Sequence, residues 1–403
     1  MSSDLRRDIF RGLYNPIYRG EKPETESQPK HSPILSCWFR LPRRQNILAF
    51  LAVLCFFTFM WHAPQISHKN FLPESLTPPI LITHKAPPPH FQDNPPIATL
   101  TAQEKQNHLL ALARNLSSTP FPQHIYQTWK TISLVCDEAY DCQNSWFRKN
   151  PSHEYTFLTD KSALDYVVEN FNASDPFIVH LFRNFPQRIL AADILRYLVV
   201  YKNGGLYTDI DTECNKPVDE WLKNATASKP DIDLSGVNVV VGMELDVVNR
   251  TQYPDRWLVE RIYKNRIQFL QWTLYAKPGH EIFRRMIMSI QDSAKEDISK
   301  TAKKSISQVR YTQTEILDKT GPFKWTEVIM GYINDIEGRK VEMEEYSGIE
   351  GSRKIGDVLF LPVNSWSPGM NHSHAGSDET SFVIHHFGGT WKLEFEKHDS
   401  DSD

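Results

Sequence analysis

The sequence predicts an α/β domain with a largely parallel sheet. Short apolar runs rich in β-branched and aromatic residues alternate with longer segments in which apolar residues recur at helical spacing. That alternation is typical of strands joined by crossover helices. One run, residues 237–243 (VNVVVGM), is apolar almost throughout, as expected for a strand buried on both faces.

Each element is predicted from its local pattern. In chain order we expect a helix at 101–115, strands at 124–129 (HIYQTW) and 155–159 (YTFLT), helices at 163–171 and 189–201, strands at 206–210, 237–243 and 267–276, a helix at 279–293, a helix opened by Gly321 and Pro322, and strands at 357–362 and 381–386. Gly204 and Gly205 allow a sharp turn out of helix 189–201. Pro322 is tolerated because the first turn of a helix does not need its missing N–H.

The chain divides into five predicted segments. These are a polar cytosolic tail (1–46), a transmembrane signal-anchor (47–63), a proline-rich stem (64–100), a main globular domain (101–397) and an acidic tail (398–403). Residues 47–61 carry no charge, and Arg40, Arg43 and Arg44 precede them, so the positive-inside rule predicts a cytosolic N-terminus. A cleaved signal peptide fits less well, because it would begin nearer residue 1 and end at small residues.

Five glycosylation sequons support a luminal main domain. All of them follow the predicted anchor, at Asn115, Asn172, Asn224, Asn249 and Asn371. The chain of 403 residues has a net charge of only −4, so its composition gives no indication of nucleic-acid binding.

The five cysteines do not form a disulfide framework, and no Cys/His cluster has zinc spacing. Cys136 and Cys142 are close enough in sequence to form a disulfide in an oxidising lumen, or else both are free thiols.

Two carboxylates, Asp209 and Asp211, end the predicted strand 206–210. Residues i and i+2 of a strand face the same side, so both side chains can converge on one point. Carboxylate oxygens are ligands for Mn²⁺ or Mg²⁺, and such a metal can hold a nucleotide diphosphate. An isolated D-x-D is more often a solvated turn or a helix cap. Here the preceding strand and glycines favour a metal site in an enzyme that uses a nucleotide sugar.

Residues 191–211 (AADILRYLVVYKNGGLYTDID) resemble the D-x-D region of glycosyltransferase family 32. The resemblance covers roughly residues 121–395, and the family includes fungal Golgi mannosyltransferases. It implies a GT-A fold, which is a Rossmann-like α/β domain. It also implies that Asp211 ligates the metal at the diphosphate, while Asp209 lies against the ribose and the metal shell.

The family pattern assigns further donor-binding residues. Asp193 and Arg196 share one helix face, where the alternative is an ordinary salt bridge; the resemblance implies that they lie beside the nucleotide sugar. Residues 124–130 (HIYQTWK) resemble the opening strand of the family, which lies under the nucleotide base. Tyr126 stands where a histidine is common, and Trp129 is either a base contact or a core residue.

Residues 384–392 (IHHFGGTWK) resemble the C-terminal motif of the family. The spacing H-x-x-G favours His386 as a third metal ligand, and we expect His385 to face the opposite side of the strand. The alternative for His386 is a hydrogen-bonded core histidine. Trp391 is expected to cover the sugar or the diphosphate.

Two acidic residues are further catalytic or acceptor-binding candidates. Glu244, with Asp246 beside it, ends the strand 237–243 and resembles a family V-G-x-E-x-D block; strand ends line ligand crevices in α/β sheets. Glu327 lies in residues 321–327 (GPFKWTE), which resemble a G-P-x-x-W-T-[DE] block. Its alternative is an ordinary acid on a helix face.

The resemblance implies a retaining, Mn²⁺- or Mg²⁺-dependent mannosyltransferase of the Golgi membrane. GDP-mannose would be the donor, and a mannose of a high-mannose N-linked glycan would accept the new sugar in α-1,6 linkage. No carboxylate is assigned as a covalent nucleophile, and front-face attack is the family expectation. Two alternatives are mannosylation of inositol-phosphoceramide and an inactive subunit of a Golgi mannan complex. Enzymes of the former kind usually carry a second hydrophobic span near the C-terminus, and none is visible after residue 63.

Overall fold

The computed structural model describes residues 100–132, 137–226, 231–248, 263–347, 351–370, 373 and 375–389. The predicted tail, anchor, nearly all of the stem, the acidic tail and Trp391 lie outside these residues, as do Cys136 and the sequons at Asn249 and Asn371. Among the helices that are described, none is long and apolar enough to cross a membrane.

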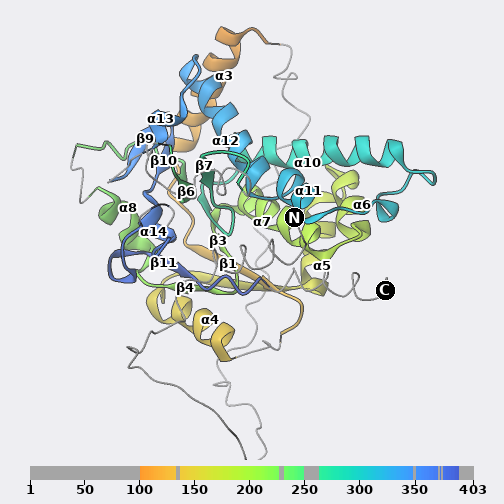
Figure 1. Ribbon diagram of the computed structural model, residues 1–403, viewed down its shortest axis with the longest axis horizontal. Coiled ribbons are helices and arrows are strands. Elements are labelled where there is room, and N and C mark those ends of the chain that lie inside the picture. Colours follow the sequence, from red (N-terminus) through yellow and green to blue (C-terminus); the bar gives the residue numbers. More distant parts are fainter. Residues whose placement is uncertain are drawn as a thin grey trace, which may run out of the picture. The chain divides into compact units, whose positions relative to one another are not determined.

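A mixed seven-stranded sheet forms the centre of the described chain (Figure 1). Its strands lie in the order β2 (Glu154–Thr159), β1 (His124–Trp129), β3 (Gly205–Thr208), β8 (Thr273–Ala276), β5 (Val239–Val241), β10 (Val358–Phe360) and β9 (Arg353–Ile355). The β1–β2, β1–β3 and β5–β10 pairs are parallel, whereas the other three neighbouring pairs are antiparallel. The predicted α/β class is confirmed, but the expectation of a largely parallel sheet is wrong.

The direction of β8 explains much of this difference. After β5 the chain continues into β6 (Met243–Asp246), which pairs antiparallel with β7 (Ile267–Phe269). From β7 the chain reaches β8 through residues 270–272 alone, and β8 runs antiparallel to β5 and β3. The predicted single strand 267–276 is two strands, separated by residues 270–272.

Helices cover both faces of the sheet (Figure 1). One face packs against α3 (Ala102–Ser117), α5 (Asp160–Phe171), α6 (Pro176–Asn184), α7 (Arg188–Asn203), α10 (Glu281–Lys300) and α12 (Pro322–Glu337). The other face packs against α4 (Asp137–Lys149), α8 (Val218–Ala225) and α14 (Val363–Trp366). The remaining short elements are α11 (Gln313–Lys319), α13 (Met343–Tyr346), the 3₁₀ turns η2 (Ile306–Gln308) and η4 (Asp378–Thr380), and the two strands β4 (Thr212–Cys214) and β11 (Val383–His385).

Strand β5 illustrates why the predicted apolar run is buried on both faces. Val239 and Val241 join the core under α7 and α10, whereas Val240 points to the core under α4 and α8. Apolar side chains at consecutive positions are needed because successive strand residues point to opposite sides.

The predicted turn after helix α7 is confirmed. Gly204 and Gly205 both have positive φ, at 66° and 86°. A Cβ on Gly204 would lie 2.6 Å from Cδ of Pro278, and one on Gly205 would lie 2.6 Å from the carbonyl oxygen of His124. The glycines therefore allow α7 to feed β3 directly into the centre of the sheet.

Candidate active site and metal centre

The Asp209–Asp211 pair lies in a tight turn between β3 and β4, and not on a strand as predicted. Strand β3 ends at Thr208, and Thr212 already belongs to β4. The backbone N–H and the hydroxyl of Thr212 both donate to the carbonyl oxygen of Asp209, at 3.2 and 2.6 Å. The turn, rather than strand alternation, brings the two carboxylates to one side.

His385 completes a candidate metal centre with these two residues. Asp209, Asp211 and His385 each offer one ligand atom, and these atoms all lie within 4.8 Å of one another. The Nε2 atom of His385 is 3.2 Å from Oδ1 of Asp211. Two carboxylates and an imidazole fit a divalent cation such as Mn²⁺, so the donor set matches the predicted metal.

We expected His386 to be the third metal ligand, but the structure places His385 beside the two carboxylates. His386 instead directs its Nε2 to Oε2 of Glu213, at 3.3 Å, and its backbone N–H donates to the carbonyl oxygen of Asp211. Strand β11 pairs antiparallel with β4, and His385 is opposite Thr212 in that register. The register with a strand about 170 residues earlier decides which histidine faces Asp211, and the local H-x-x-G spacing does not contain this information.

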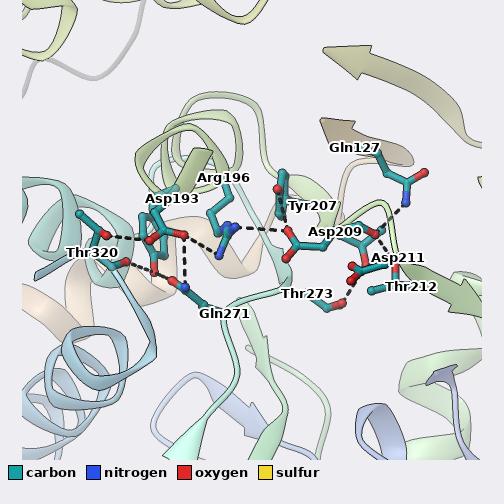
Figure 2. Close-up of polar contacts among 12 residues, drawn as sticks. Gln127, Asp193, Arg196, Tyr207, Asp209, Asp211, Thr212, Gln271, Thr273 and Thr320 are labelled. Carbon is teal, nitrogen blue, oxygen red and sulfur yellow. Dashed lines mark hydrogen bonds and ion pairs between the residues drawn. The ribbon is translucent and has the colours of Figure 1, made fainter. Parts of the chain in front are cut away.

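Neighbouring groups orient both carboxylates, and Figure 2 shows those around Asp209. Oδ1 of Asp209 accepts a hydrogen bond from the Tyr207 hydroxyl, at 2.8 Å, and lies 3.3 Å from Nη2 of Arg196. Oδ2 of Asp211 accepts the backbone N–H of Gly388, at 2.8 Å. A Cβ at Gly388 would lie 3.2 Å from the same oxygen, so a small residue suits this approach.

The two carboxylates differ in their electrostatics. Burial raises the pKa of Asp209, and the Arg196 charge opposes that rise. Burial also acts to raise the pKa of Asp211, but His385 and the Gly388 N–H outweigh it and lower that pKa to about 2. Burial acts to lower the pKa of His385, yet Asp211 outweighs it and the pKa rises. A metal ligated by His385 would require the neutral imidazole, and would therefore take the place of its proton.

Asp193 and Arg196 connect helix α7 to the same turn (Figure 2). Nη1 of Arg196 lies 2.9 Å from Asp193, and the two side chains are 5% and 1% exposed. The intrahelical salt bridge that was the alternative is therefore present, but it is buried, and Arg196 also bridges to Asp209. Burial raises the pKa of Asp193 to about 6, against the opposing effects of Arg196, Thr320 and Gln271.

The sequence interpretation missed the segment between β7 and β8. Gln271 donates to Asp193 at 3.3 Å, and the Trp272 carbonyl accepts the N–H of Asp209 at 2.8 Å. The ring of Trp272 packs on His385, with 4.4 Å between the ring centroids. A glutamine within the apolar run of residues 267–276 was the available signal, because a buried polar side chain requires a partner.

The two acidic candidates differ in position. Glu244 is buried on β6, accepts a hydrogen bond from Gln268 at 2.6 Å and helps to raise the pKa of His385, so it lies near the metal centre. Glu327 is 58% exposed and pairs with Lys324 on the surface of α12. The contact with the site comes instead from Thr320, which directly precedes residues 321–327. Its hydroxyl donates to Asp193 at 2.6 Å.

Tyr126 and Trp129, the two donor-binding candidates on β1, lie in different environments. Tyr126 is buried in the core and stacks on His124, at a centroid distance of 4.1 Å. The structure therefore places it in the core and not at the site, because alternation on β1 directs the next residue, Gln127, toward the turn. Trp129 is half-buried at the end of β1, with the Lys130 ammonium over its ring.

Comparisons with known proteins identify the family of this chain. A family model described as "Glycosyltransferase sugar-binding region containing DXD motif" matches residues 137–228, which include the turn and helix α7. An initiation-specific alpha-1,6-mannosyltransferase of Candida albicans is 34% identical over 68% of this chain and 73% of its own length. A protein of the same name from Schizosaccharomyces pombe is 32% identical over 66% and 63%. Inositol phosphoceramide mannosyltransferase 3 of S. pombe is 32% identical over 26% of this chain and 28% of its own.

Proposed function

The chain belongs to the family of glycosyltransferases with a DXD-containing sugar-binding region and is a glycosyltransferase, and from this premise we propose its reaction. It transfers mannose from GDP-mannose to a mannose of a high-mannose N-linked glycan, in α-1,6 linkage and with retention of configuration. The convergence of Asp209, Asp211 and His385 within 4.8 Å is the observation that carries the proposal. The similarity to initiation-specific alpha-1,6-mannosyltransferases over two thirds of the chain supports the sugar and the linkage.

In this proposal Asp209, Asp211 and His385 would hold Mn²⁺ or Mg²⁺ in the donor site. Bound there, the ion would supply a Lewis acid to neutralise charge on the departing nucleotide. Tyr207 and Arg196 hold Oδ1 of Asp209 and so fix the orientation of this carboxylate. The domain is accordingly proposed to be of the GT-A type, in which such a centre follows a central strand.

Arg196 is proposed both to position Asp209 and to bind the nucleotide sugar. Its guanidinium is already balanced by Asp193 and Asp209, so it adds little free positive charge for a leaving group. Its Nε–H, however, is buried and has no hydrogen-bond partner within the described residues. That orphaned donor supports a contact with an oxygen of the nucleotide sugar, because a buried N–H without a partner is costly.

The remaining assignments concern the acceptor and the base. Glu244, close to the metal centre, is proposed to contact the reacting sugars, and Trp129 is proposed to contact the nucleotide base. Trp391, which lies outside the described residues, keeps its proposed place over the sugar or the diphosphate. The surface ion pair of Glu327 leaves no observation in favour of a catalytic role.

We also propose that the protein is a single-pass type II protein of the Golgi membrane with a luminal catalytic domain. The uncharged segment 47–63 supports this, and so do the exposed side chains of Asn115 and Asn172 in their sequons. Protease protection of sealed microsomes provides the test: the N-terminal tail should be digested and the domain protected. A protected tail would overturn this topology.

The decisive experiment is a donor and acceptor panel. The full-length protein in detergent is incubated with Mn²⁺, GDP-mannose, GDP-fucose, UDP-glucose or UDP-galactose, and either a high-mannose glycan or inositol-phosphoceramide. We expect one added α-1,6-linked mannose on the glycan, from GDP-mannose only, as determined by product mass and linkage analysis. Transfer only to inositol-phosphoceramide would support the alternative reaction. Hydrolysis or transfer of no donor would support the inactive subunit, against which the assembled site argues.

A further inference from the structure

The peptide bond that follows Asp209 lies in the turn between β3 and β4, and its carbonyl oxygen has several hydrogen-bond partners. The carbonyl oxygen of Asp209 accepts three hydrogen bonds: two from Thr212 and one from Nε2 of Gln127, at 3.0 Å (Figure 2). The Thr212 hydroxyl is in turn 2.8 Å from that of Thr208, which is 2.8 Å from that of Thr273. This peptide lies between the two carboxylates, so its orientation determines where both of them point.

Two further polar side chains, Tyr155 and Gln143, form a row of hydrogen bonds that ends at Gln127. The Tyr155 hydroxyl donates to Oε1 of Gln127 at 2.5 Å, and Nε2 of Gln143 on α4 donates to the Tyr155 hydroxyl at 2.9 Å. Gln127 is fully buried and Tyr155 nearly so, at 0% and 8% exposure. Gln127 and Tyr155 face the same side of β1 and β2, where α4 covers the sheet.

The row has a single direction. Each member donates to the next, from Gln143 to Tyr155, to Gln127 and finally to the Asp209 carbonyl. Burial raises the pKa of Tyr155 well above its ordinary value, so its hydroxyl keeps the proton that it donates. That donation fixes the amide of Gln127, because a flipped amide would direct oxygen against the carbonyl oxygen of Asp209.

We infer that Gln127 is a positioning residue for the metal centre, and that Tyr155 and Gln143 hold it in the active orientation. The inference rests on the proposed function, since it concerns the carboxylates that would ligate the metal. Partners that orient metal ligands without touching the metal commonly contribute about 10–100-fold to metal affinity or activity. Gln127 of the HIYQTW strand therefore orients the β3–β4 turn, which an apolar core residue at this position could not do.

The test compares two matched substitutions by Mn²⁺ binding. Gln127→Met keeps the volume and removes the donor. Gln291→Met is the control, because Gln291 on α10 is also buried, at 8% exposure, and donates one hydrogen bond, to Asp175 at 2.7 Å. We expect both variants to lower the melting temperature in EDTA, but only Gln127→Met to weaken Mn²⁺ binding, by about 10–100-fold. Free Mn²⁺ is measured by electron paramagnetic resonance on the full-length protein.

Tyr155→Phe provides a second, milder test that retains the ring in the core. It should weaken Mn²⁺ binding less than Gln127→Met does, because the amide loses its fixed orientation but keeps its donor. Equal binding by wild type, Gln127→Met and Tyr155→Phe would overturn the inference and leave the proposed metal site intact. A wild-type protein that binds no Mn²⁺ would overturn both. If Gln127→Met does not fold, Tyr155→Phe alone decides the question.

Discussion

At the scale of the residue, each carboxylate of the β3–β4 turn lies beside its own basic side chain. Asp209 lies beside Arg196, and Asp211 lies beside His385. Two like charges so close together would otherwise repel, and one of them would remain protonated. The pairing differs in kind: the guanidinium stays charged, whereas the imidazole can lose its proton and become a ligand.

The adjacent histidines provide the first prediction. His385→Ala should weaken Mn²⁺ binding and transfer by at least the roughly 10–100-fold that the loss of an orienting partner costs. His386→Ala should have little effect on either, because its side chain lies against Glu213 and contributes no atom to the three-residue cluster. Mn²⁺ titrations of the two variants provide the measurement. The reverse order of effects would restore His386 as the ligand.

Residues that are close in sequence could be predicted, and those that depend on distant register could not. Asp193, Arg196, Asp209 and Asp211 lie within 19 residues of one another; Arg196 joins Asp193 to Asp209, and Asp211 lies in the same turn as Asp209. The choice between His385 and His386 required the pairing of β11 with β4. Tyr126 was misassigned to the site because the motif identifies the strand but not which of its residues faces the turn.

At the scale of the element, the pattern of apolar residues predicts most of the strands and helices. It does not predict where a strand is divided in two. Strand β1 has the predicted bounds, His124–Trp129, and α7 differs from its prediction by one residue at the start and two at the end. The single predicted strands 237–243 and 267–276 are each divided in two. A Cβ at Gly242, where the first divides, would lie 2.4 Å from the Trp366 ring, and this tertiary contact is not encoded locally.

The second prediction concerns a buried contact that joins four elements. Asp357 precedes β10 and accepts hydrogen bonds from His280, Asn238 and Tyr332, at 3.0, 2.8 and 2.7 Å. Asp357→Asn places an amide against these donors. It should lower the free energy of unfolding by at least about 1–3 kcal/mol, the cost of one unsatisfied buried donor. Urea denaturation at pH 7 provides the measurement, with the exposed Asp292→Asn on α10 as a control of little effect.

The same substitution should alter the pH dependence of stability. Burial acts to raise the pKa of Asp357, but His280 and the hydrogen bonds outweigh it and hold the pKa below its ordinary value of 3.8. The stabilisation is therefore complete above that value and is lost as the pH falls through the lower pKa of the folded state. The difference in unfolding free energy between wild type and Asp357→Asn should shrink below about pH 4. An unchanged difference in that range would contradict the role given to this carboxylate.

At the scale of the whole molecule, the site is assembled from segments spread over most of the described chain. Helix α7, the β3–β4 turn, residues 270–272, Thr320 and β11 each contribute a contact. The sequence predicted the α/β class of the fold and the two carboxylates of the candidate metal site, because both depend on local patterns. The antiparallel direction of β8 and the position of His385 beside Asp211 depend on how distant segments meet, so a single sequence does not determine them.

The third prediction tests whether this assembly is a metal-dependent transferase. Transfer of mannose from GDP-mannose to a high-mannose glycan is measured for full-length wild type, Asp211→Asn and the neighbouring control Glu213→Gln, after chelation and across added Mn²⁺. Wild type and Glu213→Gln should lose activity on chelation and regain it with Mn²⁺. Asp211→Asn should be folded and slower by about 100-fold or more at every Mn²⁺ concentration. Transfer by Asp211→Asn at the wild-type rate, or a wild-type rate that chelation leaves unchanged, would contradict the account.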